Sequence, residues 1–321
     1  MDYNSRIIMN AHGYLSERQN THECCCGSRF NVCSCMDACL NYFNGKVPRY
    51  ECDLLRTLYL LRYFCVHKAE IKKLFDVESG EIISYLKIPS HKNINFISIG
   101  AGPGIDFAAF LEWLNDVNVG QVRKLNLIGV DVVEGWSNQW KMVTSSYRDL
   151  FRKYSARLYR YVGDIVYLTP SSCVKGVSIV CLSYVISELV SALPEGKLEQ
   201  VLENLVSWIL GVVSGRFVLV CNDRPQKEVC RALRQVKDIL EKRGSRPVTA
   251  REYFFLRENM PSHDIIRISG RSIVRSRWGG SKFRFGNPHP PTRNSENYPS
   301  ALRRQYRAKS WCHSCQLICF A

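Results

Sequence analysis

Apolar residues in the middle of the chain occur in short continuous runs, and the stretches between these runs have helical spacing. Four runs have the length and the β-branched content of buried parallel strands. They are NFISIG (95–100), LNLIGVD (125–131), VSIVCLSYV (177–185) and RFVLVCND (216–223), with RLYRYVGD (157–164) as a weaker fifth. The segments between them, notably DFAAFLEWL and KLEQVLENLVSWIL, are amphipathic. This β-α-β order predicts an α/β fold with a doubly wound, Rossmann-like sheet.

A long helix is expected ahead of the first strand. In YECDLLRTLYLLRYFCVHKAEIKKLF the apolar residues Leu54, Leu58, Leu61 and Cys65 recur at helical spacing, and the stretch has neither Gly nor Pro. The chain has 321 residues, 46% of them hydrophobic, so it can bury the core of one large domain that carries appendages.

A glycine-rich turn follows the first expected strand. The stretch FISIGAGPG places Gly100, Gly102 and Gly104 between that strand and the next helix, with Ala101 between the first two. Glycine has no Cβ, so the backbone of such a turn can approach a ligand closely, and the following helix N-terminus offers amide donors. The turn is therefore a candidate ligand cradle.

Two acids follow the next two strands and complete a nucleoside pocket. Asp131, at the end of LNLIGVD, is placed to accept hydrogen bonds from ribose hydroxyls, and Asp164 is placed near an adenine amino group. The alternatives are that Asp131 caps the following segment and that Gly163 and Asp164 form an ordinary turn.

These residues resemble a known superfamily. FISIGAGPG, Asp131, the pair at 163–164 and SIVCLSYVISEL look like successive motifs of the class I S-adenosylmethionine-dependent methyltransferases. The resemblance covers roughly residues 94 to 223 and implies S-adenosylmethionine as cofactor. The spacing Gly-x-Gly-x-Gly also differs from the Gly-x-Gly-x-x-Gly of nucleotide-binding dehydrogenases. The implied cofactor-binding residues are Gly100, Ala101, Gly102, Gly104, Asp131, Asp164 and Ser183.

Candidate catalytic residues follow the fourth strand, where the superfamily carries its substrate signatures. Ser183 is followed by Tyr184, which can stack on an acceptor, and by Glu188, which can orient the nucleophile or accept its proton. The alternative is that Tyr184 packs at the sheet edge and Glu188 begins a helical turn. SYVISEL is similar to the strand-four region of methyltransferase-like proteins linked to mitochondrial small-ribosomal-subunit assembly, which favours RNA as the acceptor. The prolines typical of exocyclic base-amine methylation and the Pro-Cys pair of cytosine C5 methylation are absent from the sequence.

Cysteines cluster at both ends of the chain. In a reducing compartment such clusters are candidates for metal sites more than for disulfides. Cys312 and Cys315 have the spacing of a zinc knuckle, which supplies only two of four tetrahedral ligands. The N-terminal segment HECCCGSRFNVCSCMDAC offers Cys24, Cys26, Cys33 and Cys35 as the missing ligands. Unpaired thiols are the alternative, and an iron–sulfur cluster is a further one.

Positive charge is concentrated near the C-terminus. The formal net charge is +15, and residues 267 to 309 hold eleven Lys or Arg against one acid, Glu296. Aromatic residues such as Trp278, Phe285 and Tyr306 are interleaved with these charges, which favours nucleic-acid contact through phosphates and stacked bases. An acidic protein partner is the competing interpretation.

The sequence thus predicts three parts. Residues 1–47 form a Cys-rich segment, 48–270 a methyltransferase-like domain with a leading helix, and 271–321 a basic aromatic tail with a Cys cluster. The polar start of the chain and the lack of any long apolar run predict an intracellular protein without membrane association. We expect an S-adenosylmethionine-dependent methyltransferase acting on RNA. The alternatives are a methyltransferase of a protein or small molecule, and a binding or assembly factor that keeps the fold without turnover.

Overall fold

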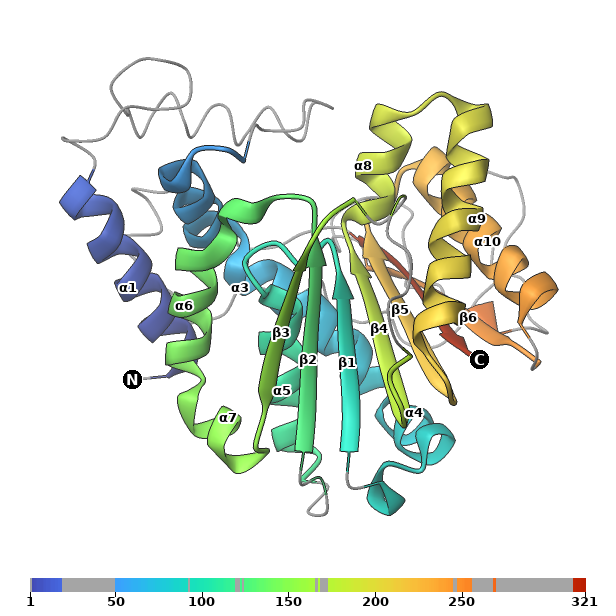
Figure 1. Ribbon diagram of the computed structural model, residues 1–321, viewed down its shortest axis with the longest axis horizontal. Coiled ribbons are helices and arrows are strands. Elements are labelled where there is room, and N and C mark those ends of the chain that lie inside the picture. The colour runs from blue at the N-terminus through green and yellow to red at the C-terminus, as the bar shows by residue number, and fades with distance from the viewer. Residues whose placement is uncertain are drawn as a thin grey trace.

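The computed structural model describes residues 2–18, 50–91, 93–118, 122, 124–164, 167, 173–244, 247–255, 268–269 and 314–321. Figure 1 shows one sheet in the middle of the molecule with helices on both of its faces. The strands are β1 Asn93–Ile99, β2 Lys124–Asp131, β3 Arg157–Val162, β4 Val177–Ser183, β5 Phe217–Asp223, β6 Thr249–Phe255, β7 Ile268–Ser269 and β8 Ser314–Phe320.

The sheet has the strand order β3-β2-β1-β4-β5-β8-β6-β7. The first five strands in this order pair in parallel, and β8 is antiparallel to both β5 and β6. All five expected strands are present, and β1, β4 and β5 are buried along almost their whole length. Strands buried on both faces read as continuous apolar runs, which is why the sequence pattern located them.

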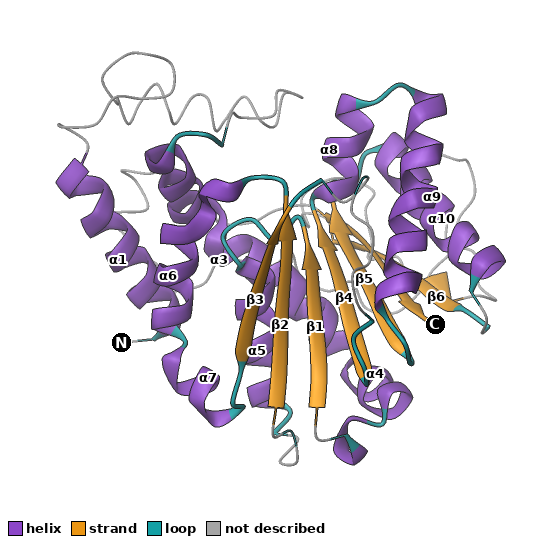
Figure 2. Cartoon of the chain, viewed as in Figure 1, coloured by secondary structure: helices purple, strands orange, loops and turns teal. Residues whose placement is uncertain are grey.

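The described helices form a layer on each face of the sheet. They are α1 Tyr3–Arg18, α3 Asp53–Val77, α4 Ser79–Leu86, α5 Ile105–Asp116, α6 Ser137–Ser146, α7 Arg148–Lys153, α8 Val185–Ala192, α9 Glu195–Val212 and α10 Lys227–Arg243, with short 3-10 turns at Ile88–Ser90 and Glu134–Trp136. One apolar core joins α1, α3, α5 and α6 to one face, and a second joins α8, α9 and α10 to the other (Figure 2). The doubly wound α/β fold is therefore confirmed.

The leading helix is confirmed, and a helix before it belongs to the same core. The expected long helix is α3, and α1 packs against it through Ile7, Ile8, Ala11 and Leu15, all fully buried. Residues 3–18 are thus part of the fold, although the sequence pattern assigned residues 1–47 to a separate Cys-rich segment. Residues 19–49, which contain the cysteines of that segment, lie outside the described residues.

The end of the chain completes the sheet. Strand β8 lies between β5 and β6, with Leu219 opposite Cys319 and Ala250 opposite the same residue on the other side. Residues 314–321 are all buried. The boundary expected at residue 271 therefore does not separate these last residues from the domain, because they supply an interior strand. Most of the basic segment 267–309 lies outside the described residues.

Among the described helices, none combines the length and the apolar composition needed to cross a bilayer.

Candidate functional site

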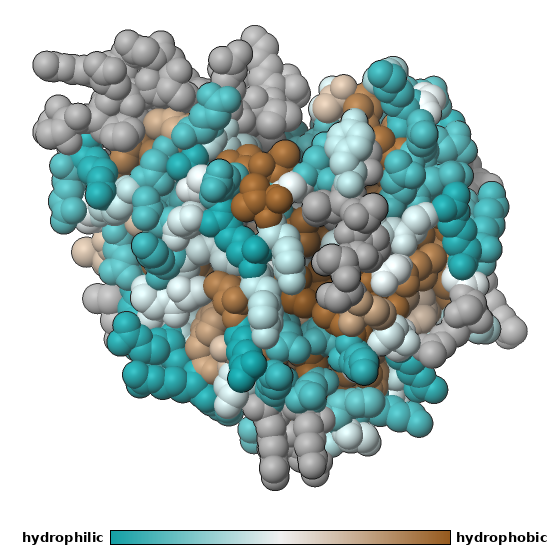
Figure 3. Space-filling model, in the orientation of Figure 1, coloured by the Kyte–Doolittle hydropathy of each residue, from teal (hydrophilic) through white to brown (hydrophobic). Residues whose placement is uncertain are grey.

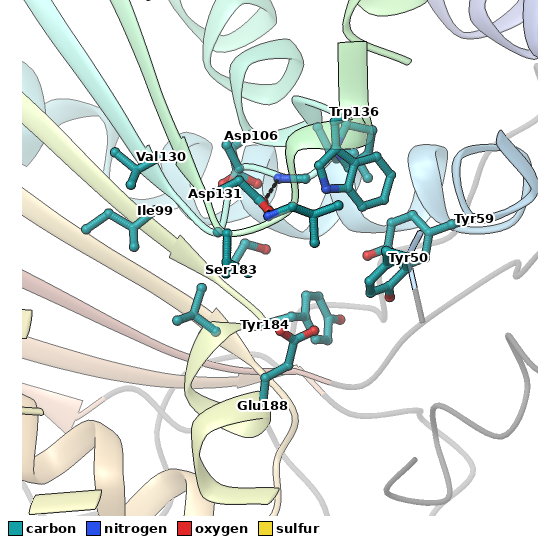
Figure 4. A pocket seen from close by; sticks show the side chains of 18 of the residues that line it. Tyr50, Tyr59, Ile99, Asp106, Val130, Asp131, Trp136, Ser183, Tyr184 and Glu188 are labelled. Carbon is teal, nitrogen blue, oxygen red and sulfur yellow. Dashed lines mark hydrogen bonds between the residues drawn. The ribbon is translucent and has the colours of Figure 1, made fainter. Parts of the chain in front are cut away.

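A pocket opens at the carboxyl ends of β1, β2 and β4, which is where open α/β sheets bind their ligands. Figure 4 shows its side chains. It is lined by the turn after β1, the ends of β2 and β4, residues 163–164 after β3, the start of α8 and the aromatic side chains of Tyr50, Tyr59, His67 and Trp136. Of the predicted site residues, Gly100, Ala101, Gly102, Asp131, Asp164, Ser183, Tyr184 and Glu188 all line it.

The three glycines of the turn each adopt a conformation that side chains disfavour. Gly100, Gly102 and Gly104 have φ of 65°, 47° and 84°. A Cβ on Gly100 would lie 2.5 Å from Cγ2 of Val185, whereas a Cβ on Gly102 would meet nothing closer than 3.9 Å. Gly102 thus presents bare backbone with open space beside it, as close contact with a ligand requires. Gly104 does not line the pocket but forms the left-handed N-cap of α5.

Asp131 ties the end of β2 to the glycine turn. Its Oδ2 accepts a hydrogen bond of 2.7 Å from the amide of Gly102, and its Oδ1 accepts one of 2.7 Å from the amide of Val133. Burial raises the pKa of Asp131, and these two amides act in the opposite direction. A carboxylate has about four lone-pair positions, so Asp131 keeps acceptor capacity for ribose hydroxyls while it shapes the turn. The hydrogen bond from Val133 agrees with the capping alternative, and ribose binding by Asp131 stays a prediction.

Tyr184 has a left-handed backbone, which is rare for a residue with a large side chain. Its φ is 61°, its ring stacks on His67 at a centroid distance of 4.2 Å, and its hydroxyl donates a 2.8 Å hydrogen bond to Oε2 of Glu70. The amide of Tyr184 also donates to the carbonyl of Asn222 at 2.8 Å. Strained backbone that is held by several contacts clusters at functional sites. Tyr184 is buried, so these contacts also agree with the alternative of a packed tyrosine, and its role in stacking on an acceptor stays a prediction.

The N-terminus of α8 is capped from the neighbouring strand. Asp223, at the end of β5, accepts a 2.9 Å hydrogen bond from the amide of Ser187 through Oδ2 and one of 2.8 Å from the amide of Arg224 through Oδ1. A carboxylate at this position offsets the positive end of the helix dipole. Asp223 thereby fixes the first turn of α8, which places Glu188 at the pocket.

Aromatic side chains form the wall that faces Glu188. Tyr50, Tyr59 and Trp136 contact one another with ring centroids between 5.2 and 5.9 Å apart. Burial raises the pKa of Tyr59 well above its ordinary value, and the negative charge of Glu188 adds to this effect. The carboxylate of Glu188 therefore interacts electrostatically with the Tyr59 hydroxyl across the pocket. Aromatic faces and a carboxylate attract planar and cationic groups.

Asp106 is a site residue that the sequence analysis missed. It lies in the first turn of α5, lines the pocket, and accepts a 2.7 Å hydrogen bond from Oγ of Ser98. Burial raises its pKa to about 6, against the opposing effect of hydrogen bonds from Ser98 and Cys181. An acid directly after the glycine turn was the available signal.

The sequence analysis also missed a row of aromatic and polar side chains on one face of α3. Tyr59, Tyr63, His67 and Glu70 follow one another at intervals of three or four residues, so they share one face of the helix. His67 stacks between Tyr63, at 5.2 Å, and Tyr184. The apolar periodicity located the helix. The spacing of these four residues along one face was the signal that could have indicated the row.

The predicted metal ligands are only partly described. Cys24, Cys26, Cys33, Cys35 and Cys312 lie outside the described residues. Cys315 is buried in β8, where its thiol donates a hydrogen bond of 3.0 Å to the carbonyl of Arg224 and burial raises its pKa. Within the described part of the chain, no group of three or more His, Cys, Asp or Glu residues is placed to hold a metal ion.

The sheet order and the glycine turn define the type of fold. Five parallel strands ordered β3-β2-β1-β4-β5, an antiparallel strand between β5 and β6, and a glycine turn after β1 make up the fold of the class I S-adenosylmethionine-dependent methyltransferases. The resemblance drawn from the sequence motifs is confirmed at this level.

Comparisons with known proteins add likeness of fold. No family model matches the chain, and no curated protein matches its sequence. Similar solved structures include a protein of Listeria monocytogenes assigned to the class I S-adenosylmethionine-dependent methyltransferases (11% identity, 99% of this chain and 87% of that chain covered, TM-score 0.39). They also include a protein of Nostoc punctiforme assigned to the O-methyltransferases (14%, 75% and 73%, 0.35) and the plantazolicin methyltransferase BpumL (11%, 99% and 96%, 0.34). The fold is identified from the strand order rather than from these scores.

Proposed function

We propose that the chain transfers methyl groups from S-adenosylmethionine to RNA. What carries the proposal is the convergence on one pocket of the bare backbone at Gly102, the carboxylate of Asp131 and the strained Tyr184. The first two suit a nucleoside with ribose hydroxyls, and the third suits an acceptor held beside it.

The residues of the pocket fit the cofactor in a specific way. Gly102 is proposed to let the cofactor approach the backbone, and Asp131 to accept hydrogen bonds from its ribose. Gly100, Asp164 and Ser183 also line the pocket, and the last two are proposed to bind the adenine and the amino-acid portion. S-adenosylmethionine, when bound, supplies a methyl group activated by a positive sulfonium. The chain therefore needs to bind, orient and exclude water more than it needs an activated nucleophile.

Tyr184 and Glu188 are proposed to hold the acceptor. The ring of Tyr184 is fixed between His67 and the bond to Glu70, so it offers a rigid surface beside the pocket. The carboxylate of Glu188, half-buried on α8, can accept the proton that an acceptor N–H or O–H group loses when it gains the methyl group. Asp223 contributes indirectly, because it fixes the turn from which Glu188 projects.

The choice of RNA is supported by charge. The net charge of +15 and the excess of Lys and Arg at 267–309 favour a polyanion over a neutral small molecule. Aromatic residues among those charges suit stacked bases. The basic segment 267–309 is therefore proposed to bind the RNA.

The test is transfer of labelled methyl from S-adenosylmethionine into fractionated RNA, protein and small metabolites by the purified full chain. We expect label in the RNA fraction, and a loss of about 100-fold or more in turnover for Glu188→Gln. Asp238→Asn, an exposed acid on α10, is the matched control and should keep full turnover. Label in protein or small molecules alone would overturn the RNA assignment. Cofactor binding without any transfer would identify a binding factor instead.

Zinc stays a prediction of the sequence. The buried thiol of Cys315 donates to a backbone carbonyl, which does not favour a metal thiolate, so the prediction depends on cysteines outside the described residues. Elemental analysis of the purified chain, compared with the Cys24→Ser and Cys26→Ser double variant, tests it. A stoichiometric metal lost in the variant supports the site, and no stoichiometric metal in the wild type removes it.

A further inference from the structure

Strand β3 forms one edge of the sheet and carries two exposed tyrosines. Tyr159 is 38% exposed and Tyr161 48% exposed, and they alternate with Leu158 and Arg160 along the strand. In a strand, alternate residues project to the same face. Arg157, Tyr159 and Tyr161 therefore share one face of β3, and they are paired in register with Asn126, Ile128 and Val130 of β2.

This face is the one packed against α8, α9 and α10 farther along the sheet. Ile128 and Val130 belong to the same apolar core as residues of those helices, whereas no described helix covers β3 there (Figure 2). Figure 3 looks onto this face and shows hydrophobic surface near its middle, bordered by hydrophilic residues. The rings of Tyr159 and Tyr161 thus lie at the open margin of a sheet face.

Basic residues precede and flank these tyrosines in the sequence. From Arg148 to Arg160 the sequence has five Arg or Lys residues and one acid, Asp149. Asp149 lies 3.9 Å from Arg6, while Arg152 and Arg157 are exposed and make no ion pair with another described residue. Arg160 projects to the other face, where it donates to Ser137 and to the carbonyl of Glu134.

The strand also leads to the pocket. Val162 ends β3, and the next two residues, Gly163 and Asp164, line the pocket. From Arg157 to Val162 the strand spans about 16 Å. A ligand lying along this strand therefore ends beside the cofactor-binding residues.

From this arrangement we infer that the exposed face of β3, with Arg157, Tyr159 and Tyr161, binds single-stranded RNA and leads it to the pocket, with the exposed Arg152 of α7 as a further phosphate contact. Bases stack on the two rings, and the arginines contact phosphates. The charge favours RNA over an apolar peptide added to the strand edge, since such a peptide gains nothing from the exposed Arg152 and Arg157. The inference rests on the proposed function and locates the substrate for it.

The test measures binding of a fluorescein-labelled single-stranded RNA of about 15 nucleotides to the full chain by anisotropy. The Tyr159→Ala, Tyr161→Ala double variant should bind at least about tenfold more weakly, because stacking is worth about 1–3 kcal/mol per base. The matched Tyr159→Phe, Tyr161→Phe variant keeps both rings and should bind like the wild type. Both tyrosines are exposed, so unfolding temperatures should stay close to that of the wild type.

A second pair of variants tests the phosphate contacts. Arg152→Gln with Arg157→Gln should lower the slope of log affinity against log salt by about one to two. Lys227→Gln with Lys242→Gln makes the same charge change on α10, at exposed positions, and should leave the slope less affected.

The outcomes separate this surface from the proposed function. If the wild type binds and methylates RNA but the alanine variant binds RNA as tightly, the assignment of RNA binding to β3 is wrong and the proposed function stands. If the wild type neither binds nor methylates RNA, the proposed acceptor is wrong and the surface falls with it. If the wild type binds a labelled extended peptide but no RNA, and the alanine variant loses the peptide, the strand edge takes a protein partner and the inference is overturned.

Discussion

Tyr184 shows how one residue can be held in an unfavourable conformation by its neighbours. A left-handed non-glycine backbone costs of order 1–3 kcal/mol, and it persists only where the surroundings determine it. Here the stack on His67, the bond to Glu70 and the bond from its amide to Asn222 hold it. The tyrosine ring is thereby fixed at the pocket before any ligand binds.

Removing the hydroxyl of Tyr184 should lower the stability of the protein while the ring keeps its place. Tyr184→Phe keeps the stack on His67 but loses the buried bond to Glu70, so we expect the free energy of unfolding to fall by about 1–2 kcal/mol. Urea denaturation of the variant and the wild type measures this. Tyr3→Phe, at a partly buried tyrosine of α1 whose ring stacks on Tyr147, is the control. A loss as large in the control as in Tyr184→Phe would contradict the account.

Asp106 should give the stability of the protein a defined pH dependence. Because burial raises its pKa to about 6 from 3.8, the folded protein keeps a proton between these values that the unfolded chain has released. Stability therefore falls as pH rises from about 4 to about 6 and is level for this group above that, with a loss of up to about 3 kcal/mol.

Asp106→Asn removes this titration. Urea unfolding of both proteins at several pH values between about 4 and 7 gives the difference in unfolding free energy between variant and wild type. We expect that difference to shift in favour of the variant as pH rises through this window. Parallel curves for the two proteins would show that Asp106 does not titrate there.

At the scale of elements, the strands were predictable because each is short, apolar and bounded by turn residues. The runs at 95–100, 125–131, 177–185 and 216–223 became β1, β2, β4 and β5 with shifts of one or two residues at their ends. The pocket residues after three of these strands followed from the same reading, since parallel strands end at one edge.

What the sequence could not indicate depends on distant parts of the chain meeting. Strand β8 reads SCQLICF, which is short and separated from β6 by a long basic segment, so nothing local placed it between β5 and β6. The same holds for the contact of Glu70 with Tyr184, which joins residues 114 positions apart. Local periodicity carries no information on such pairs.

Strand β8 should be essential for folding. It pairs with β5 on one side and β6 on the other, and its residues are all buried. A chain that ends at residue 313 loses this interior strand and exposes two sheet edges. We expect it to lack the cooperative thermal transition of the full chain, as followed by circular dichroism. A truncated chain that unfolds at the same temperature as the full one would show that residues 314–321 are a dispensable tail.

At the scale of the whole molecule, one pocket lies at the carboxyl ends of the parallel strands, and the edge strand β3 leads to it. The glycine turn and Asp131 lie at the ends of β1 and β2, and β3 continues from the basic residues of α7 to Gly163 and Asp164. Aromatic residues of α3 close the pocket from the other face of the sheet (Figure 4). A nucleoside cofactor and a polyanion, bound as proposed, would meet at this edge.

Calorimetric titration with S-adenosylhomocysteine, the demethylated product, tests this account most directly. The wild type should bind it, and Gly102→Val should abolish measurable binding, because a β-branched side chain would occupy the open space beside the turn and strain a backbone with φ of 47°. Gly196→Val, at an open position in the first turn of α9, is the matched control and should keep the affinity of the wild type. Circular dichroism should show that all three proteins are folded. Equal affinity in the wild type and Gly102→Val, or no binding by a folded wild type, would contradict the assignment of the pocket.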